Sequence, residues 1–150
     1  MAKVTEHFES DEKCVIEGDL SEAYSKNGRK VIRRMCWEPN RGERGVLTVT
    51  DIVVPKRKNT VTFLLHCQAE PVLDGNTVTL HGRDRTLVCR VQSPAEVKIT
   101  AIGGAGSQFV HDGANFEPKT HAAEEGWGRV EISAKGKEVR FCVEMEICKK

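Results

Sequence analysis

Residues 30–54 constrain the fold more than any other stretch, because they read as two long strands joined by one turn. Residues 31–37 and 46–54 are rich in β-branched and aromatic side chains, which suit a pleated surface. Between them, Pro39, Asn40 and Gly42 supply the fixed and positive φ values that a chain reversal needs. Both strands mix apolar with charged residues, which is typical of a sheet with one face on a core and the other toward water.

Shorter alternating segments follow along the chain, separated by turn signals. Alternation with a period of two residues indicates half-buried strands, and no segment shows a long amphipathic helical period. We therefore predict an all-β fold, an antiparallel β-sandwich of about nine strands with one long Gly-rich loop. Outside the long hairpin, the predicted strands are 13–19, 60–68, 77–81, 86–91, 96–102, 127–134 and 138–147.

Four segments carry more specific expectations. Residues 60–68 form the most apolar predicted strand, so we expect it to lie centrally. Residues 77–91 read as a meander, and the last two predicted strands, joined by Lys135-Gly136-Lys137, read as a closing hairpin. The Gly-rich loop spans residues 103–126, and connections of this length are usually functional or mobile.

The length and the polar N-terminus suggest a simple domain organisation. A chain of 150 residues fits one domain with its own core. Residues 1–12 are polar and acidic with no clear period, so we expect a flexible or edge-lying lead-in. Residues 13–150 then form the β-sandwich domain.

Charge and hydropathy exclude two classes of partner. Lys and Arg total 23 against 22 Asp and Glu, so a net charge of +1 creates no long-range attraction for a nucleic acid or an anionic membrane. No run approaches the ~18 apolar residues of a membrane helix, and residues 1–8 lack the apolar core of a signal peptide. Any contact with a polyanion must therefore be local.

The six cysteines leave two interpretations open. They include no Cys-x-x-Cys pair of the kind that zinc ribbons use. The two interpretations are small buried hydrophobic side chains and one or more disulfides. Four of the six lie inside apolar strand-like runs, namely Cys14, Cys36, Cys67 and Cys89.

Adjacent arginines in the long hairpin predict an ion pair. Successive side chains of a strand point to opposite faces, so Arg33 and Arg34 cannot both face outward. One of the two must face inward or lie at an edge, where we expect a carboxylate partner.

Five residues are candidates for contact with a sugar: Trp127, His111, Asn115, His66 and Arg34. A flat ring such as that of Trp127, between two glycines at the end of the loop, complements the CH face of a pyranose. His111 and Asn115 lie in the long polar loop with other potential ligands of a cation or a sugar. Their spacing matches no known metal loop, so we predict no metal site and no cofactor.

Plainer interpretations stand beside these. His66, at the end of the most apolar strand, is also typical of a core or edge histidine. Tyr24 has the right chemistry for a proton donor, but a tyrosine after Gly-Asp and a turn is more often a corner residue whose hydroxyl caps backbone. Trp37, in the middle of a strand, is expected in the core. Basic residues at turns, such as Lys56 and Arg57, matter for an anionic glycan only if they cluster on one face.

A family resemblance runs through the ordered motifs of the chain. Four short motifs occur in a fixed order and are followed by the Gly-rich loop and the closing strands. They are Gly18-Asp19-Leu20-Ser21-Glu22-Ala23-Tyr24, Arg33-Arg34, Thr50-Asp51-Ile52-Val53 and Phe63-Leu64-Leu65-His66. In this order the chain resembles the C-terminal β-domain of heparinase II/III-like polysaccharide lyases. The resemblance covers residues 14–147. It implies the C-terminal part of a larger protein, in which a β-sandwich packs beside an α/α toroid. The two would hold an acidic polysaccharide that is cut by β-elimination.

The resemblance also implies which groups are missing. In that family a Tyr and a His act as acid and base, and an Asn or Arg neutralises the uronate carboxylate; these groups come mainly from the toroid. This chain has no toroid and no His-x-His segment ahead of Gly18, so we assign no catalytic residue. The fragment alone is expected to be inactive, and the implied parent enzyme is secreted or periplasmic.

Three functions therefore compete, and each predicts a different surface. An accessory domain of a polysaccharide lyase should leave a broad apolar patch bare where the toroid docks. A free-standing carbohydrate-binding module should show a compact aromatic platform with polar neighbours. A structural or protein-interaction sandwich should show neither.

Overall fold

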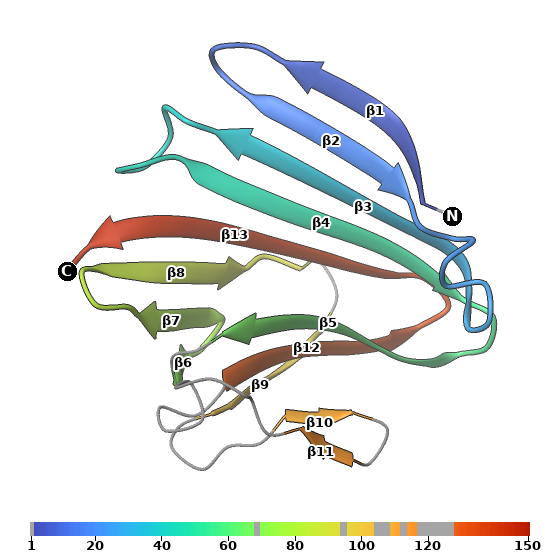
Figure 1. The fold of residues 1–150 in the computed structure, drawn as a ribbon. Helices are drawn as coiled ribbons and strands as arrows, with labels where there is room; N and C mark the ends of the chain where they lie inside the picture. Colours follow the sequence, from blue (N-terminus) through green and yellow to red (C-terminus); the bar gives the residue numbers. More distant parts are fainter. Residues whose placement is uncertain (1, 68–69, 94–95, 104–108, 112–113, 117–127) are drawn as a thin grey trace.

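The computed structural model describes residues 2–67, 70–93, 96–103 and 128–150, together with the backbone of 109–111 and 114–116. Within these ranges the chain forms thirteen strands and no helix, and so has no helix that could cross a membrane. The strands build one sheet of eight strands, one of three and a separate two-stranded ladder (Figure 1). The predicted all-β, sandwich-like architecture is confirmed.

The large sheet contains most of the chain, and every neighbouring pair of strands in it is antiparallel. Its order is β1-β2-β3-β4-β13-β8-β7-β6, so the last strand of the chain lies in the middle. The strands are β1 (Lys3–Glu9), β2 (Cys14–Asp19), β3 (Gly28–Glu38), β4 (Val46–Pro55), β6 (Pro71–Asp74), β7 (Thr77–His81), β8 (Arg85–Val91) and β13 (Val139–Lys149).

The predicted long hairpin is the pair β3 and β4, whose ladder runs from Gly28 opposite Pro55 to Glu38 opposite Val46. The predicted meander is also present, as β7 and β8, and the short strand β6 precedes it. Residues 3–9, for which we expected a flexible or edge-lying lead-in, form the edge strand β1 on β2. Part of the predicted Gly-rich loop is a hairpin of β10 (Phe109–His111) and β11 (Ala114–Phe116).

The small sheet has the order β5-β12-β9, with β5 (Asn59–Cys67), β12 (Gly128–Gly136) and β9 (Lys98–Ile102). The expectation that residues 60–68 lie centrally was therefore wrong, because β12 is the strand with two neighbours. The apolar residues of β5 are divided between its two faces. Phe63 is buried against the large sheet, whereas Leu64 points away from it and is 49% exposed.

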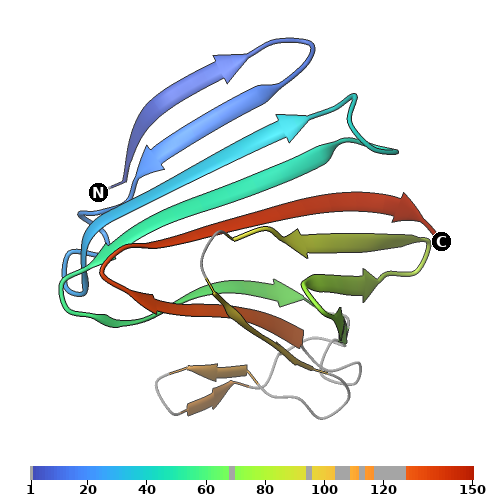
Figure 2. The same cartoon turned by 180° about the vertical axis from the view of Figure 1, so that it is seen from behind.

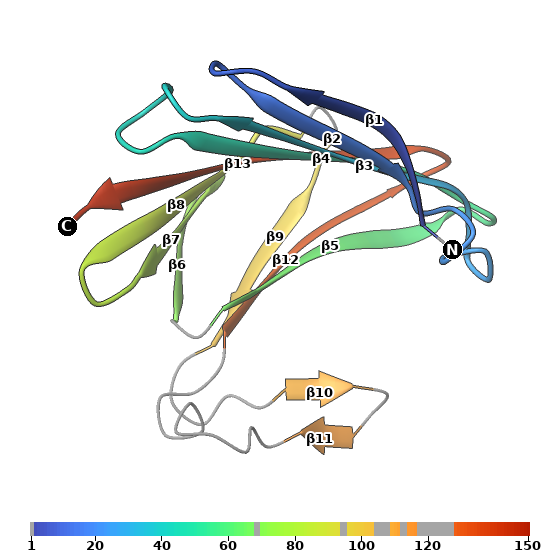
Figure 3. The same ribbon diagram turned by 45° about the horizontal axis from the view of Figure 1, so that its top comes forward.

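The β4–β5 and β12–β13 connections are two of those that lead from one sheet to the other, and neither closes a hairpin. β4 leads into β5 and β12 leads into β13, yet each strand pairs only within its own sheet. The expected closing hairpin of the last two strands was therefore wrong: β12 pairs with β5 and β9, and β13 pairs with β4 and β8. We call these two connections the arches. Figure 3 shows the small sheet crossing one side of the large sheet.

The core lies between the two sheets. Side chains that alternate along β4, β7, β8 and β13 meet those of β5 and β12 on what we call the inner face of the large sheet. Phe141 is 1% exposed, and its ring centroid lies 6.2 Å from that of Phe63 in the opposite sheet. Register places Val49, Asp51 and Val53 of β4 on this inner face, because directly paired residues share a side.

The predicted inward-facing arginine is Arg33. It pairs with Asp51 in the ladder, and its Nε and Nη2 atoms donate to the two carboxylate oxygens of Asp51 at 2.7 and 2.6 Å. Its guanidinium also lies 5.4 Å from the centroid of the Phe63 ring, a cation–π contact. The hydrogen bonds that Arg33 donates to Asp51 raise the pKa of Arg33. Arg34 points to the other face and reaches Glu6 at 3.3 Å.

All six cysteines are free thiols. Cys89 is the fully buried one, and it lies in the core cluster with Cys67 packed beside that cluster. Burial raises the pKa of the Cys89 thiol to about 11, and Cys67 adds to the effect. Burial also raises the pKa of Cys67. Of the two interpretations of the cysteines, the structure has the one without disulfides.

The Cys89 pKa predicts a loss of stability in alkali. Between pH 9 and 11 the unfolded thiol ionises while the buried thiol keeps its proton, because its pKa rises from 9.0 to about 11. The folded state then binds more protons than the unfolded state, so the free energy of unfolding falls as the pH rises, by up to about 1.4 kcal/mol per pH unit. Urea titrations at several pH values should show a shallower fall in the Cys89→Val variant. Equal slopes in the two proteins would contradict the prediction.

Candidate functional site

Strands β1–β3 extend the large sheet beyond the small one (Figures 1 and 2). The inner face of this extension carries four exposed apolar side chains, which we call the inner strip: Val4, Ile16, Met35 and Trp37. Register places them together. Ile16 pairs with Met35, which pairs in turn with core residue Val49, and Trp37 pairs with Leu47.

The inner strip continues the apolar face of the core beyond the area that the small sheet covers. Ile16, Met35 and Trp37 are each 38% exposed, whereas Val49, the next residue across from Met35, is 6% exposed. Val4 is 65% exposed on the edge strand. The expectation that Trp37 lies in the core was therefore wrong: it lies near the end of β3, outside the area that the small sheet covers. Its indole packs against Gly45, where a Cβ atom would come within 2.2 Å of the ring and where φ is +90°.

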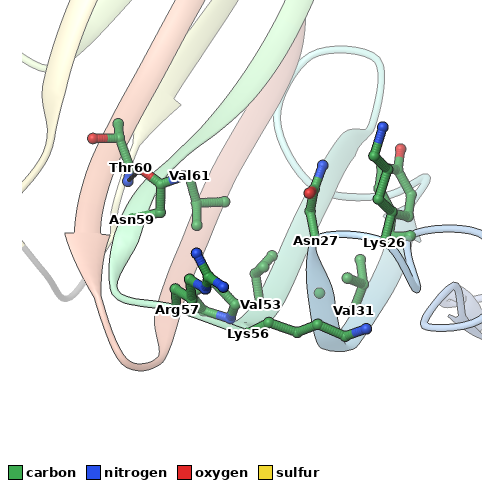
Figure 4. A pocket seen from close by; sticks show the side chains of 12 residues that line it. Lys26, Asn27, Val31, Val53, Lys56, Arg57, Asn59, Thr60 and Val61 are labelled. Carbon is green, nitrogen blue, oxygen red and sulfur yellow. Dashed lines mark hydrogen bonds between the residues drawn. The ribbon is translucent and has the colours of Figure 1, made fainter.

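At the opposite end of β3 and β4, next to the β4–β5 arch, lies a hollow of about 600 Å³. Its floor is apolar and includes Val31, Val53 and Val61. Figure 4 shows Lys56 and Arg57 of the arch on one side and Lys26 and Asn27 on the other, with Val53 between them. We call this feature the basic hollow.

The basic hollow has one sign of charge. Three cations line it, Lys26, Lys56 and Arg57, and its twelve lining residues include no carboxylate. Neutral hydrogen-bonding groups complete the rim, from Asn27, Asn59 and Thr60. This concentration of positive charge stands out in a chain whose net charge is only +1.

Backbone hydrogen bonds fix the two segments that form the rim. The Lys56 amide donates to the Asn27 carbonyl at 2.9 Å and joins them directly. The amides of Asn27 and Gly28 both donate to the Tyr24 carbonyl, at 3.0 and 2.8 Å, and hold the 20–28 turn in shape. At the start of that turn, Ser21 donates from its amide to Asp19 at 2.8 Å, and the hydrogen bonds from Ser21 lower the pKa of Asp19.

A smaller cavity of about 120 Å³ adjoins the hollow and shares Tyr24, Val31, Val53 and Val61 with it. Arg33 and Asp51 also line this cavity, together with Phe141. The ion pair therefore separates the basic hollow from the inner strip, and all three features lie on the inner face. Tyr24 is 57% exposed and lines both cavities, so it lies at the mouth of the site.

The sugar-contact residues expected from the sequence lie in different places. His66 is exposed on β5 opposite Arg129, on the side of the small sheet away from the core. Arg34 lies on the outer face of the large sheet with Glu6, so the structure does not bring these two together. His111 and Asn115 lie on the β10–β11 hairpin, where Val110 pairs with Asn115 and His111 with Ala114. Trp127 lies outside the described residues.

Lys56 and Arg57 are recognisable in the sequence as basic turn residues, but the other polar residues of the hollow are not. They include Lys26, Asn27 and Asn59, and no sequence motif distinguishes them from other polar residues. The end of β4 faces the 20–28 turn through the β3–β4 ladder, in which Gly28 pairs with Pro55. The missing information was the arch, which brings Asn59, Thr60 and Val61 of β5 to the same place. Among the described residues, no three His, Cys, Asp or Glu side chains come together as a metal site would need.

Comparison with known proteins identifies the fold. No protein-family model matches the chain, and no curated protein matches it. The heparan sulfate lyase HepC from Pedobacter heparinus matches with a TM-score of 0.74 and 12% identity, over 99% of this chain and 22% of that chain. A heparinase III structure matches with a TM-score of 0.66 and 13% identity, over 99% of this chain and 21% of that one. A further heparinase III gene product gives 0.71 and 12%, with coverage of 99% and 22%. The chain thus spans about a fifth of the length of these enzymes and shares the fold of that part.

Proposed function

We propose that this chain is the non-catalytic C-terminal β-sandwich domain of a heparinase II/III-like polysaccharide lyase. One observation carries the proposal: the fold matches such enzymes over 99% of this chain but over only 22% of theirs. One domain of a larger enzyme would give this combination of a high coverage of this chain and a low coverage of the enzyme. The ordered sequence motifs support the same family independently, because they rest on residue types and their order along the chain and not on the path of the backbone.

In this proposal the inner strip packs on the α/α toroid of the parent chain. The strip is the kind of bare apolar patch that an accessory domain should leave where its partner docks. Burying Ile16, Met35 and Trp37, each now 38% exposed, would complete the core that β4 and β13 begin. Removing this apolar surface from water stabilises the association by about 25 cal/mol per Å².

The same arrangement forms one wall of a cleft for an acidic polysaccharide. A toroid seated on the inner strip would lie beside the Arg33–Asp51 pair and the basic hollow, because all three occupy the inner face of one sheet. Tyr24 and the cations at the mouth of the hollow would then border the space between the two domains. We also propose that His111, Asn115 and Trp127 contact the polysaccharide, with His66 and Arg34 as separate peripheral contacts.

A free-standing carbohydrate-binding module is the second candidate, and the basic hollow favours it. Such a module needs no docking surface, so the inner strip would have no role. It also predicts a compact aromatic platform. The exposed aromatic side chains of the described residues are Phe8, Tyr24 and Trp37, which lie respectively on the outer face, at the hollow and on the inner strip.

Association with a helical region tests the primary proposal. Sequencing the gene upstream of the Met1 codon should reveal a helical-repeat region, and that region, expressed separately, should bind this chain. Replacing Ile16 and Met35 together by Ser should weaken the association at least about tenfold, because polar side chains would be buried in the interface.

The matched control is Leu64→Ser, which removes an apolar side chain that is 49% exposed on the far side of the small sheet. It should leave the association unchanged in isothermal titration calorimetry. A gene without a helical region, or equal losses for the two variants, would overturn the docking proposal. Turnover of heparan sulfate by this chain alone, followed by ultraviolet absorbance of the unsaturated uronate product, would overturn its non-catalytic role.

A further inference from the structure

We propose that the basic hollow is a binding subsite for a sulfate or carboxylate group carried by one sugar unit of an acidic polysaccharide. The identity of the ligand rests on the proposed function. The existence of an anion-binding site rests on the described residues alone.

The size and composition of the hollow suit one sugar unit. Its volume of about 600 Å³ lies in the range of small-molecule sites, about 300–1,000 Å³. The valine floor offers apolar contact to the CH groups of a pyranose ring. The amides of Asn27 and Asn59 and the hydroxyl of Thr60 can both donate to and accept from ring hydroxyls.

The charge of the hollow selects an anion. Elsewhere in the described chain, six arginines form ion pairs with carboxylates: Arg33, Arg34, Arg41, Arg90, Arg129 and Arg140. In the hollow, by contrast, Lys26, Lys56 and Arg57 converge on a space that no carboxylate lines. A sulfate or carboxylate would supply the missing negative charge. Arg57 can bind such a group through two parallel hydrogen bonds, and the lysines add point charges.

The hollow is also formed before any ligand arrives. The Lys56 amide bonds the Asn27 carbonyl, and the 20–28 turn is closed by two amides on the Tyr24 carbonyl. The Leu20 amide donates to the Val31 carbonyl at 2.8 Å, and the Val31 amide donates to the Ser21 hydroxyl at 2.9 Å. Because these bonds fix the backbone on both sides, binding orders only the ends of the three cationic side chains, and this lowers its entropic cost.

A binding experiment with a defined probe tests the inference. A heparin hexasaccharide is titrated into the folded chain, and the dissociation constant and residue-resolved chemical shifts are recorded. The shifts should be largest at Asn27, Asn59 and the arch. The variant K56Q/R57Q should bind about tenfold or more weakly, since each charge-assisted hydrogen bond lost to the ligand costs about that factor. Maltohexaose, a neutral probe of the same length, should not compete.

The matched control is R83Q/R85Q, which removes the same charge from the β7–β8 turn and the first residue of β8, away from the arches (Figure 1). It should bind the hexasaccharide within about twofold of the wild type, and thermal unfolding should show that both variants are folded. Equal losses in the two variants, shifts confined to His111 and Asn115, or no binding at millimolar probe would overturn the subsite. None of these outcomes involves the association with the helical region, so the proposed function and the subsite can fail separately.

Discussion

Replacing Phe141 by Ala should lower the free energy of unfolding by about 4 kcal/mol, within the 3–5 kcal/mol found when a buried Phe is truncated. Phe141 is 1% exposed in the central strand of the large sheet and meets Phe63 of the small sheet. Truncation would leave a cavity between the sheets, where two rigid layers cannot easily collapse. The loss would be a large part of the 5–15 kcal/mol that stabilises a typical domain.

Chemical denaturation in guanidinium checks this result. Leu64→Ala is the control, because Leu64 is 49% exposed on the side of β5 opposite to Phe63 and should cost less than about 1 kcal/mol. Phe141→Leu, which keeps most of the volume, should fall between the two. If Phe141→Ala cost no more than Leu64→Ala, the contact between the two sheets would not be the core of this protein.

Replacing Arg33 by Met should cost about 3 kcal/mol, because it leaves the buried carboxylate of Asp51 without its partner. Asp51 is 7% exposed, whereas 41% of the Arg33 side chain is exposed. The reverse change, Asp51→Ala, should therefore cost less, since water can partly solvate the remaining guanidinium. The cost expected for Arg33→Met lies at the low end of the range for breaking a buried ion pair, because this pair is partly exposed to water.

Comparison with an exposed ion pair identifies the cause. Arg140→Met, which breaks the exposed pair with Glu138 on the same sheet, should cost less than about 1 kcal/mol in the same denaturation measurements. Equal losses of stability in Arg33→Met and Arg140→Met would contradict the explanation by a buried ion pair.

The fold class and the long hairpin could be predicted from the sequence. Apolar and polar residues alternate along a strand according to which of its two faces is buried. Along β4, Val49 and Thr50 point to opposite faces, and every paired neighbour repeats the pattern. The inward arginine followed from the same rule. Two adjacent arginines cannot share a face, and Asp51 is the residue that the ladder places beside Arg33.

The sheet to which each strand belongs could not be predicted in the same way. A turn sequence such as Lys135-Gly136-Lys137 shows that the chain reverses, but a hairpin and an arch need the same reversal. Whether the two strands then pair or stack depends on which other strands offer a free edge. The position of β5 and the exposure of Trp37 both follow from that choice. The basic hollow does too, because β5 supplies Asn59, Thr60 and Val61 to its lining.

The central positions of β12 and β13 determine when the protein can fold during synthesis. β13 fills the gap between β4 and β8, and β12 fills the gap between β5 and β9. A nascent chain that has left the ribosome only as far as residue 127 lacks the middle strand of both layers. The strands made earlier then have edges without a pairing partner. The sandwich can therefore form only after residues 128–149 have emerged from the ribosome.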